Sequence, residues 1–534
     1  MITTLYHPSL SFRTANPRTS CLTAAGRSSR IPRRRDPLPN PVTRPDNPPI
    51  STIGVTTADR PQLLERCLWS LTRQLNADGT PVRLIVVDAS KDSHNESLGR
   101  AAVSAIRRAT DHAISFIGRK EKLAIRTALR AFCDDSLLEL AFQPDASGNR
   151  NIILLLSSGE NVLFVDDDVV CDVWRPRSFR RAIALGGHVE QRNIAFYARR
   201  ENVYEGLVKA RVGLLDAHQI VLGRTVRSLV TSKSLAVDAR PACRHLRRAA
   251  RGLQPARVRM TFTGIAGDAG VTYPDRLLFS TGTWKAVLAG SRKSFDTAFK
   301  SREVCKVGNR YIVMHEFACM TGCLGFSNTS IAPPFLPVGR NEDGLFGATV
   351  SAIDPDVVAC HLPYAVIHAS ARSPRYSGGR FPSARETRFA DLLISLIRLW
   401  VPRIRANDSR RRLIRLGGWL QHLATLRKPD FVGVTSLVTL ETREMELTRI
   451  EAALADRDGY PAYWQRDLRS YQAMLLKNAR KAQFQLPLEF HHARTISAGY
   501  DELRTFVRRA GELYVAWPTL WMKGKTILRD FPGE

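Results

Sequence analysis

Three consecutive carboxylates, Asp166, Asp167 and Asp168, follow directly on the apolar run Val162–Val165. Four apolar residues bounded by polar ones are typical of a strand buried on both faces, as in a parallel sheet. Acids at the carboxyl end of such a strand lie where open α/β sheets bind their ligands. Because alternate residues of an extended segment share a face, we expect Asp166 and Asp168 to converge on one cation. Oxygen ligands favour Mg²⁺ or Mn²⁺ over zinc, and the alternative interpretation is a solvated acidic turn.

A second charged group lies in the segment 333–347, which reads P-P-F-L-P-V-G-R-N-E-D-G-L-F-G. Its paired prolines and the following Arg-Asn-Glu-Asp cluster predict a structured loop that opens a helix. Acids in the first turn of a helix are electrostatically favourable, so capping alone explains them. A catalytic interpretation requires a carboxylate that takes a proton from an acceptor hydroxyl group. Both interpretations of Glu342 and Asp343 are open on these residues alone.

The chain has 534 residues, a formal net charge of +29, and 44% hydrophobic and 24% charged residues. This length allows two or three domains, and the composition is that of a soluble globular protein. The positive charge favours an anionic partner, which includes nucleotides, nucleic acids and acidic membrane surfaces. No apolar run is long enough for a transmembrane helix. An odd number of cysteines, nine, predicts reduced thiols in a cytoplasmic protein.

Cysteine and histidine residues allow one further metal hypothesis. A zinc site could be drawn from Cys319, Cys323, Cys360 and His361, but their spacing matches no strong zinc signature. We therefore expect buried thiols at these positions.

Regular structure is predicted from Ile50 onwards. Ser51–Thr57 is a first strand, helical spacing follows Pro61, and Arg83–Val87 is a second strand. Strand, helix and strand in this order form a βαβ unit, so the sheet should be parallel. Asp88 then lies at the carboxyl edge of the sheet, where a single acid often bonds a ribose or a base. A helix cap or a turn is the alternative role for this residue.

The chain between the second strand and the acidic run is basic. Ser115–Leu140 is predicted to be a basic helical segment, and residues 148–151 form a turn into the apolar run Ile152–Leu156. Arg150 is placed to face phosphate charge, although a surface arginine is the default interpretation. The glycine-rich fingerprints of dinucleotide-binding and P-loop proteins are absent, which disfavours those functions.

Four segments in order resemble glycosyltransferase family 2, namely T-T-A-D-R-P, V-V-D, G-N-R-N-I-I-L-L-L-S-S-G-E and V-L-F-V-D-D-D-V. The resemblance covers the donor half of that family, from Ile50 to about Asp172. It implies an α/β GT-A fold, a Rossmann-like and mostly parallel sheet flanked by helices. It also implies a nucleotide-diphosphate sugar donor and Mn²⁺ or Mg²⁺ as cofactor. Ala89 stands where many members have a second aspartate, which leaves the nucleotide open, and Asn149 replaces the alanine of the family's A-R-N segment.

The resemblance assigns roles on the donor side. It implies a nucleotide-sugar-binding set of Thr57, Asp59, Arg60, Asp88, Arg150, Asn151, Asp166 and Asp167. The D-x-D pair Asp166 and Asp168 is expected to hold the metal. His368, at the end of the strand-like run Val357–His368, is expected to be a further ligand, with His361 in reserve. A structural histidine is the alternative.

On the acceptor side, Glu342 and Asp343 are similar to the E-D motif of the same family. That motif supplies the catalytic base, so Asp343 is expected to be the base. Glu342 is expected to orient the acceptor or the loop.

The sequence predicts three parts: a disordered basic tail at 1–47, a GT-A domain at 48–375 and a mainly helical C-terminal accessory domain at 376–534. The tail is rich in Arg, Pro, Ser and Thr and cannot bury a core, although a transit peptide has a similar composition. Residues 370–383 are rich in Ser, Gly, Pro and Arg and predict a linker. The C-terminal part could instead contact an anionic bilayer through Trp517, Trp521, Lys523 and Lys525.

The predicted function is a metal-dependent, inverting glycosyltransferase in the cytoplasm, with peripheral contact to the inner face of the membrane as an option. The acceptor is open among polysaccharides, lipid-linked carriers, proteins and small molecules. One rival is a nucleotidyltransferase that forms sugar nucleotides, but the chain lacks its basic glycine-rich loop after the first strand. The other rival is a basic nucleic-acid-binding protein, but the arginines are dispersed and no specific nucleic acid is expected.

Overall fold

The computed structural model describes residues 47–78, 81–110, 112–186, 192–238, 243–371, 375–376, 381, 386–403, 406, 408–456, 459–479, 481 and 485–528. Contacts divide the chain into residues 1–45 and 46–534, and the described residues all belong to the second unit. The predicted tail, apart from Asn47, and most of the predicted linker at 370–383 lie outside the described residues.

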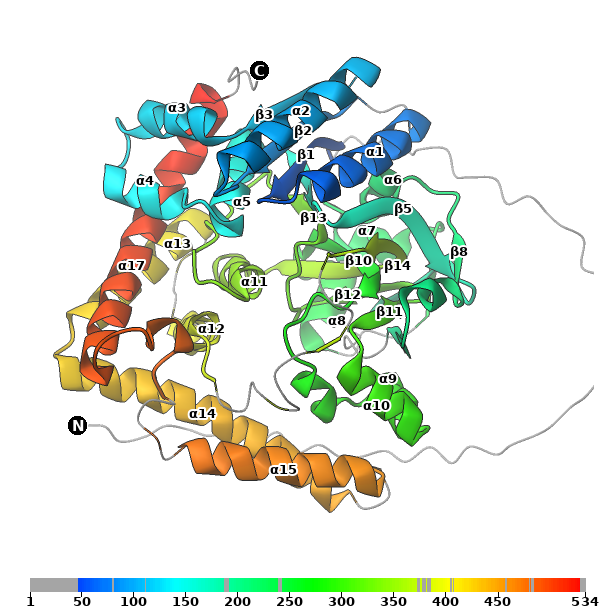
Figure 1. Cartoon of the computed structure of the whole chain (residues 1–534), viewed down its shortest axis with the longest axis vertical. Coiled ribbons are helices and arrows are strands. Elements are labelled where there is room, and N and C mark those ends of the chain that lie inside the picture. Colours follow the sequence, from blue (N-terminus) through cyan, green and yellow to red (C-terminus); the bar gives the residue numbers. More distant parts are fainter. Residues whose placement is uncertain are drawn as a thin grey trace, which may run out of the picture. The chain divides into compact units, whose positions relative to one another are not determined.

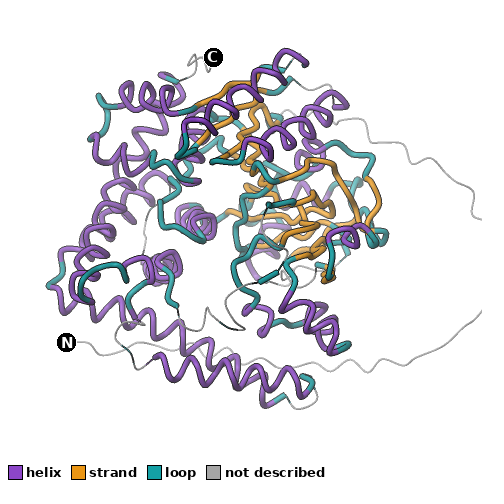
Figure 2. Tube along the Cα trace, viewed as in Figure 1, coloured by secondary structure: helices purple, strands orange, loops and turns teal. Residues whose placement is uncertain are grey.

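The described strands form a 14-stranded sheet (Figures 1 and 2). They are β1 (Ile50–Thr57), β2 (Arg83–Asp88), β3 (Ile114–Ile117), β4 (Asn161–Asp166), β5 (Val169–Pro176), β6 (Ala182–Leu185), β7 (Asn193–Tyr197), β8 (Leu207–Lys209), β9 (Ala236–Val237), β10 (Arg257–Asp268), β11 (Glu303–Val307), β12 (Tyr311–Met314), β13 (Cys323–Ser327) and β14 (Val357–His368). The main path runs β3-β2-β1-β4-β13-β10-β14-β12-β6-β9, with the other strands attached at its sides. Pairing is parallel from β3 to β4 and mixed beyond β4. The predicted α/β class is confirmed, and beyond β4 the pairs β10–β14, β12–β6 and β6–β9 are parallel as well.

The described α-helices are α1 (Pro61–Asp78), α2 (Ser93–Ala109), α3 (Arg119–Leu129), α4 (Asp135–Ala141), α5 (Ala146–Leu156), α6 (Leu214–Gln219), α7 (Val226–Thr231), α8 (Arg244–Ala250), α9 (Gly282–Ala289), α10 (Arg292–Lys300), α11 (Glu342–Ile353), α12 (Phe389–Trp400), α13 (Ser409–Thr425), α14 (Lys428–Ala455), α15 (Ala462–Ala479) and α17 (Ile496–Ile527). Short 3₁₀ turns lie at Arg200–Tyr204, Asp275–Phe279, Val401–Arg403 and Leu488–Phe490. Gly459, Tyr460 and Pro461 lie between α14 and α15.

Helices cover both faces of the parallel half of the sheet. The apolar residues of α1 and α2 belong to one hydrophobic cluster, and those of α3 and α5 belong to another on the opposite face. Helix α5 crosses β1 closely, since a Cβ atom added at Gly54 would lie 2.4 Å from Ile153. Every strand of this half is therefore buried on both sides, which explains why Val162–Val165 is an uninterrupted apolar run.

Two predicted segments differ from the structure. Residues 148–151 are not a turn but the first half of α5, because Asp145 caps the helix by accepting a hydrogen bond from Gly148 N at 2.8 Å. The segment 115–140 is not one helix, since β3 ends inside it and α3 and α4 follow. The apolar residues of β3 extend the parallel sheet, and this pairing overrides the helical pattern.

The C-terminal helices share a hydrophobic core with the sheet. One cluster contains Leu154 of α5, Phe346 of α11, Leu393 of α12 and Trp517 of α17. Trp517 is fully buried, and Trp521 is partly buried and donates to Asn328 Oδ1 at 2.9 Å. Among the described helices, none is long and apolar enough to cross a membrane.

Candidate functional site

The carboxyl ends of three parallel strands meet at one edge of the sheet. Thr57 of β1 is opposite Asp88 of β2, and Thr56 is opposite Asp166 of β4. The predicted convergence of these strand ends is confirmed. Hydroxyl groups and carboxylates gathered at this edge are the groups with which open α/β sheets bind ligands.

The acidic turn that follows β4 is held by hydroxyl and guanidinium groups. The Thr57 hydroxyl donates to Asp167 Oδ2 at 2.7 Å, and Arg60 Nη2 lies 2.7 Å from Asp167 Oδ1. Arg60 also reaches Asp168 Oδ2, which is 3.1 Å from its Nη1. Asp167 is fully buried, and burial raises its pKa to about 7 against the opposing effects of Arg60 and Thr57. Asp167 therefore ties the acidic turn to the start of α1.

His368 lies beside Asp168, with its Nε2 3.1 Å from Asp168 Oδ1. Its Nδ1 lies 2.8 Å from the backbone oxygen of Asp268, and this carbonyl accepts only, so Nδ1 carries a proton. Burial acts to lower the pKa of His368, but the hydrogen bond and charge of Asp168 raise it to about 9. Burial acts to raise the pKa of Asp168, but His368 and Arg60 hold it at about 2. The reserve histidine, His361, lies elsewhere and contacts Arg192.

Arg150 joins the acidic edge to the acceptor-side motif. Its Nη2 lies 2.9 Å from Asp166 Oδ1 and its Nη1 lies 2.7 Å from Glu342 Oε1. The side chain of Arg150 is only 4% exposed, whereas those of Asp166 and Glu342 are 26% and 16% exposed. Burial acts to lower its pKa, but the charges of Asp166, Glu342 and Asp343 outweigh burial and raise the pKa above its usual value. Two carboxylates far apart in the sequence thus share one buried cation.

The acidic pair Glu342 and Asp343 opens α11 immediately after a strained residue. Asn341 has φ of 70°, in the left-handed region that residues other than glycine rarely adopt. Its Nδ2 donates to Asp391 Oδ1 of α12 at 2.8 Å. The turn also requires Gly344, because a Cβ atom there would lie 2.2 Å from Asn341 Oδ1. A residue of the C-terminal helices therefore holds the backbone from which both acids project.

The carboxyl group of Asp343 has a raised pKa. Burial raises its pKa to about 6, the charge of Glu342 adds to this effect, and Arg150 opposes it. Its Oδ1 accepts a hydrogen bond from the neighbouring Gly344 N at 2.8 Å. Both acids lie in the first turn of α11, as the capping alternative requires, and Glu342 is in addition bonded to Arg150.

A second strained residue lies at the predicted nucleoside pocket. Asp59 has φ of 54°, and its carboxylate accepts hydrogen bonds from Lys91 N at 3.1 Å and Asp92 N at 3.2 Å. Ser90 donates to Asp88 Oδ1 through its hydroxyl group at 2.7 Å, and it accepts from Asp59 N. Burial raises the pKa of Asp88. Among the described residues other than glycine, only Asp59 and Asn341 have positive φ, and strain of this kind concentrates at functional sites.

Two residues that support this pocket were missed by the sequence reasoning. Asn149 donates from Nδ2 to the backbone oxygens of Thr57 at 3.1 Å and Val87 at 2.9 Å, so it clamps β1 to β2. Lys122 of α3 donates to Asn149 Oδ1 at 2.6 Å, and burial lowers its pKa to about 8. The only sequence signal was the departure of Asn149 from the family alanine.

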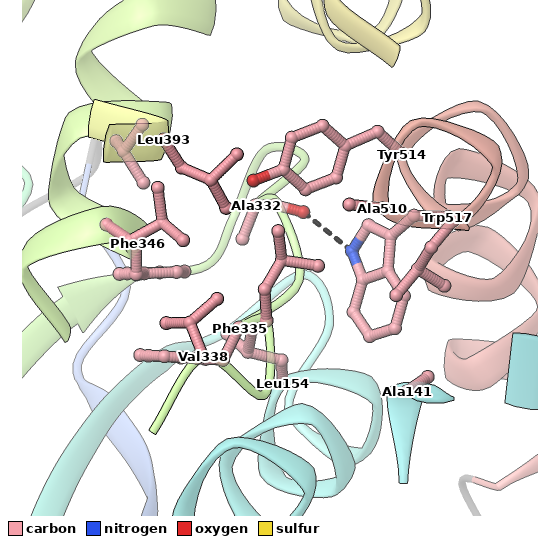
Figure 3. Packing of buried hydrophobic residues seen from close by; sticks show 14 of the residues in the cluster. Ala141, Leu154, Ala332, Phe335, Val338, Phe346, Leu393, Ala510, Tyr514 and Trp517 are labelled. Carbon is pink, nitrogen blue, oxygen red and sulfur yellow. Dashed lines mark hydrogen bonds between the residues drawn. The ribbon is translucent and has the colours of Figure 1, made fainter. Parts of the chain in front are cut away.

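Asn151 supports the loop 328–341 between β13 and α11, which we call the acceptor loop after its predicted role. Its amide donates to the backbone oxygen of Phe335 at 2.9 Å and accepts from Phe335 N at 2.7 Å. Figure 3 shows the same loop packed against α17, where Trp517 Nε1 donates to the backbone oxygen of Ala332 at 2.8 Å. The ring of Phe335 stacks on Phe346 of α11 at 3.9 Å between centroids. These contacts fix the loop that leads to Glu342.

The predicted metal ligands are only partly assembled. Asp168 and His368 are in contact, whereas Asp166 Oδ1 faces Arg150 and accepts from Thr56 Oγ1 at 3.1 Å. In the part of the chain that the structure describes, no group of three or more His, Cys, Asp and Glu side chains is arranged to hold a metal ion. The expectation of buried thiols is confirmed for Cys319, Cys323 and Cys360.

Comparisons with known proteins find only remote likeness. No protein-family model and no curated protein matches the sequence. Among solved structures, S. aureus TarS is 12% identical with a TM-score of 0.26, over 82% of this chain and 55% of that chain. The mannosyltransferase PcManGT from Pyrobaculum calidifontis, in complex with GDP-Man and Mn²⁺, is 12% identical with a TM-score of 0.28, over 90% of this chain and 91% of that chain. The chain spans about half the length of TarS, and likeness at these scores carries no argument about activity.

Proposed function

We propose that this protein is a GT-A-type glycosyltransferase that moves a sugar from a nucleotide-diphosphate sugar to an acceptor hydroxyl group. One observation carries the proposal: the buried guanidinium of Arg150 bonds both Asp166 at the sheet edge and Glu342 at the start of α11. A donor bound at the edge and an acceptor bound at α11 would meet beside this residue. A protein that only binds nucleic acid has no need for such a junction.

The donor would bind across the strand ends. Thr57, Asp59 and Asp88 lie where the nucleoside is expected, and the 39%-exposed side chain of Arg60 can meet the diphosphate. Ligand roles for Asn151 and Asp167 stay predictions, since the hydrogen bonds of both side chains hold neighbouring structure.

A divalent cation fits the set Asp166, Asp168 and His368 by chemistry. Carboxylate oxygens and an imidazole nitrogen suit Mn²⁺, and a carbonyl group on the other ring nitrogen is the usual support of a metal-bound histidine. A bound cation would neutralise charge on the departing diphosphate. Arg60, Arg150 and the proton on His368 Nε2 balance the same carboxylates, so cation binding would compete with their contacts and displace that proton.

Asp343 would perform the proton transfer. With a pKa of about 6 it is mostly ionised at neutral pH and can accept the proton of the acceptor hydroxyl group. The acceptor oxygen then bonds the anomeric carbon while the bond from that carbon to the diphosphate breaks. Attack opposite the departing group inverts the anomeric configuration.

Donor binding by the full-length protein tests this proposal. We would titrate UDP-, GDP-, dTDP- and ADP-sugars by calorimetry with Mn²⁺, and again with EDTA, and follow slow donor hydrolysis. We expect one donor to bind, and Asp166→Asn to weaken binding about tenfold to a hundredfold because it removes a charged partner. Asp172→Asn, on β5, the next strand along the chain, with a 24%-exposed side chain, is the matched control and should bind as the wild type does. Failure of the folded wild type to bind any of these donors would contradict the proposal.

A further inference from the structure

A buried group of basic side chains lies apart from the carboxylates described above. Arg192 precedes β7, Lys306 lies on β11 and His361 lies on β14, with exposed fractions of 5%, 9% and 4%. Arg192 Nη1 lies 3.4 Å from His361 Nδ1. Burial and the charge of Arg192 lower the pKa of Lys306 to about 7, although Asp268 opposes this. We call these three residues the basic cluster.

One ring nitrogen of His361 in the basic cluster is a hydrogen-bond donor without an acceptor among the described residues. Arginine can only donate, so Nδ1 of His361 accepts and the neutral ring carries its proton on Nε2. That buried Nε2 has no hydrogen-bond partner within the described residues. Lys306 makes no ion pair among the described residues, and its ammonium group has three N–H donors. Buried charges and buried donors of this kind normally have a partner.

One loop connects the basic cluster to the candidate catalytic residues. The loop between β12 and β13 begins near Phe317, whose ring lies 6.2 Å from Phe262, and the Phe262 ring lies 5.2 Å from His361. Further along, Cys319 packs against Gly347 of α11, where an added Cβ would meet it at 2.5 Å.

The same loop ends at the acidic turn. The backbone oxygen of Gly322 accepts from Asp166 N at 3.1 Å. From the sheet edge, the loop therefore contacts Gly347 of α11 and then, through Phe262, the basic cluster. Because α11 begins with Glu342 and Asp343, we assign the cluster to the acceptor side.

An aromatic side chain borders the cluster. Trp284 of α9 is half-buried, its Nε1 donates to the backbone oxygen of Arg192 at 2.9 Å, and its ring lies 5.9 Å from the guanidinium. Large aromatic rings beside charged groups suit a ligand that has both an apolar face and a charge. A sugar ring that carries an acidic group has these two properties.

We propose that Arg192, Lys306 and His361 form a subsite for an anionic group, a phosphate or a carboxylate, on the acceptor. The anion would accept from His361 Nε2 and from the Lys306 ammonium group, and Trp284 would contact the adjacent sugar. The anion site stands on the cluster itself, whereas its assignment to the acceptor rests on the proposed transferase function. The acceptor is then an acidic saccharide rather than a neutral one.

Thermal unfolding of the full-length protein with millimolar sulfate tests the subsite, with chloride at matched ionic strength as reference and acetate as a second arm. A ligand that binds only the folded state raises Tm, and we expect a rise of about 2 °C. Lys306→Met should abolish the rise, and its own Tm in chloride should be no lower than that of the wild type, because a buried ammonium group without a partner is removed. Lys293→Met on α10, where the lysine is exposed, is the control and should keep the rise.

Several outcomes would overturn the subsite. An equal rise in Lys306→Met, or no rise with either anion in the wild type, would do so. If Lys306→Met does not fold, NMR titration of the ¹⁵N-labelled wild type tests the subsite instead. The His361 Nε2 signal must then shift on addition of sulfate or acetate. A response to sulfate alone indicates a phosphate group, and a response to acetate indicates a carboxylate. None of these measurements needs a donor, so their failure leaves the donor titration standing.

Discussion

The sheet edge and the acceptor loop hold their acids by different means. At the edge, Thr57, Asp88 and Asp166 come together because parallel strands of neighbouring βαβ units end at the same level. At the acceptor loop, the acids are held by side chains from distant helices, among them Asn151 of α5 and Asp391 of α12. The first arrangement follows from backbone register, and the second depends on tertiary contacts.

This difference indicates how each region should respond to mutation. Loss of one side chain at the edge removes a group that would contact the donor or the cation, but leaves the register of the strands intact. Loss of a support at the acceptor loop moves the backbone that carries Glu342 and Asp343. Arg150 belongs to both regions, so its loss should affect both.

The largest effect is expected from Asp343→Asn. An amide cannot take the acceptor proton, so we expect the transfer rate to fall about 10²–10⁴-fold. Donor affinity, measured by calorimetry, should stay within a factor of about three, because Asp343 belongs to the acceptor side. A donor affinity that falls as steeply as the transfer rate would contradict the assignment of Asp343 to the acceptor side.

The pH profile of the wild type checks the same residue. Burial raises the pKa of Asp343 to about 6, so the ionised base is lost as pH falls through 6 and kcat/KM should drop with it. Above that pH the rate should level off. Glu342→Gln removes a negative charge that raises this pKa, so the inflection should move to lower pH. A flat profile between pH 5 and 8 would exclude Asp343 as the base.

The sequence predicts the sheet edge better than the acceptor loop, and the reason is physical. A buried strand requires an apolar run, so the run Val162–Val165 predicts β4. The run Val357–His368 likewise predicts that His368 ends a strand, which is β14. The contact of His368 with Asp168 could then be anticipated. By contrast, nothing in the local sequence pairs Asn341 with Asp391, because that contact depends on how α12 packs.

Residues of α5 also show that tertiary contacts limit what the sequence predicts. Glycine and two asparagines favoured a turn at 148–151, but burial and the Asp145 cap make this segment helical. The helix then directs Asn149 to the strand ends and Asn151 to the acceptor loop. The resemblance placed Arg150 near the donor, whereas its bond to Glu342 needed the tertiary structure.

An intermediate effect on both regions is expected from Arg150→Met. Two carboxylates would lose a buried cation, and we expect a loss of about 3–5 kcal/mol in the free energy of unfolding, measured with urea. Arg150→Lys can reach one carboxylate only and should recover part of that loss. If Arg150→Met weakens transfer but leaves stability unchanged, then the guanidinium is not the structural junction described here.

The smallest effect is expected from Asp391→Ala, which tests whether α12 positions the acceptor acids. Asn341 would keep its left-handed backbone but lose the hydrogen bond to Asp391, which stabilises it by about 1 kcal/mol. If the loss of this hydrogen bond displaces Glu342 and Asp343, kcat for transfer should fall by about fivefold while donor affinity is unchanged. Asp430→Ala on α14 removes an exposed acid that pairs with Arg427 and is the control, since surface pairs contribute little. Equal kcat values for the two variants would mean that α12 packs against the loop without positioning its acids, because a purely structural role would lower stability and leave kcat unchanged.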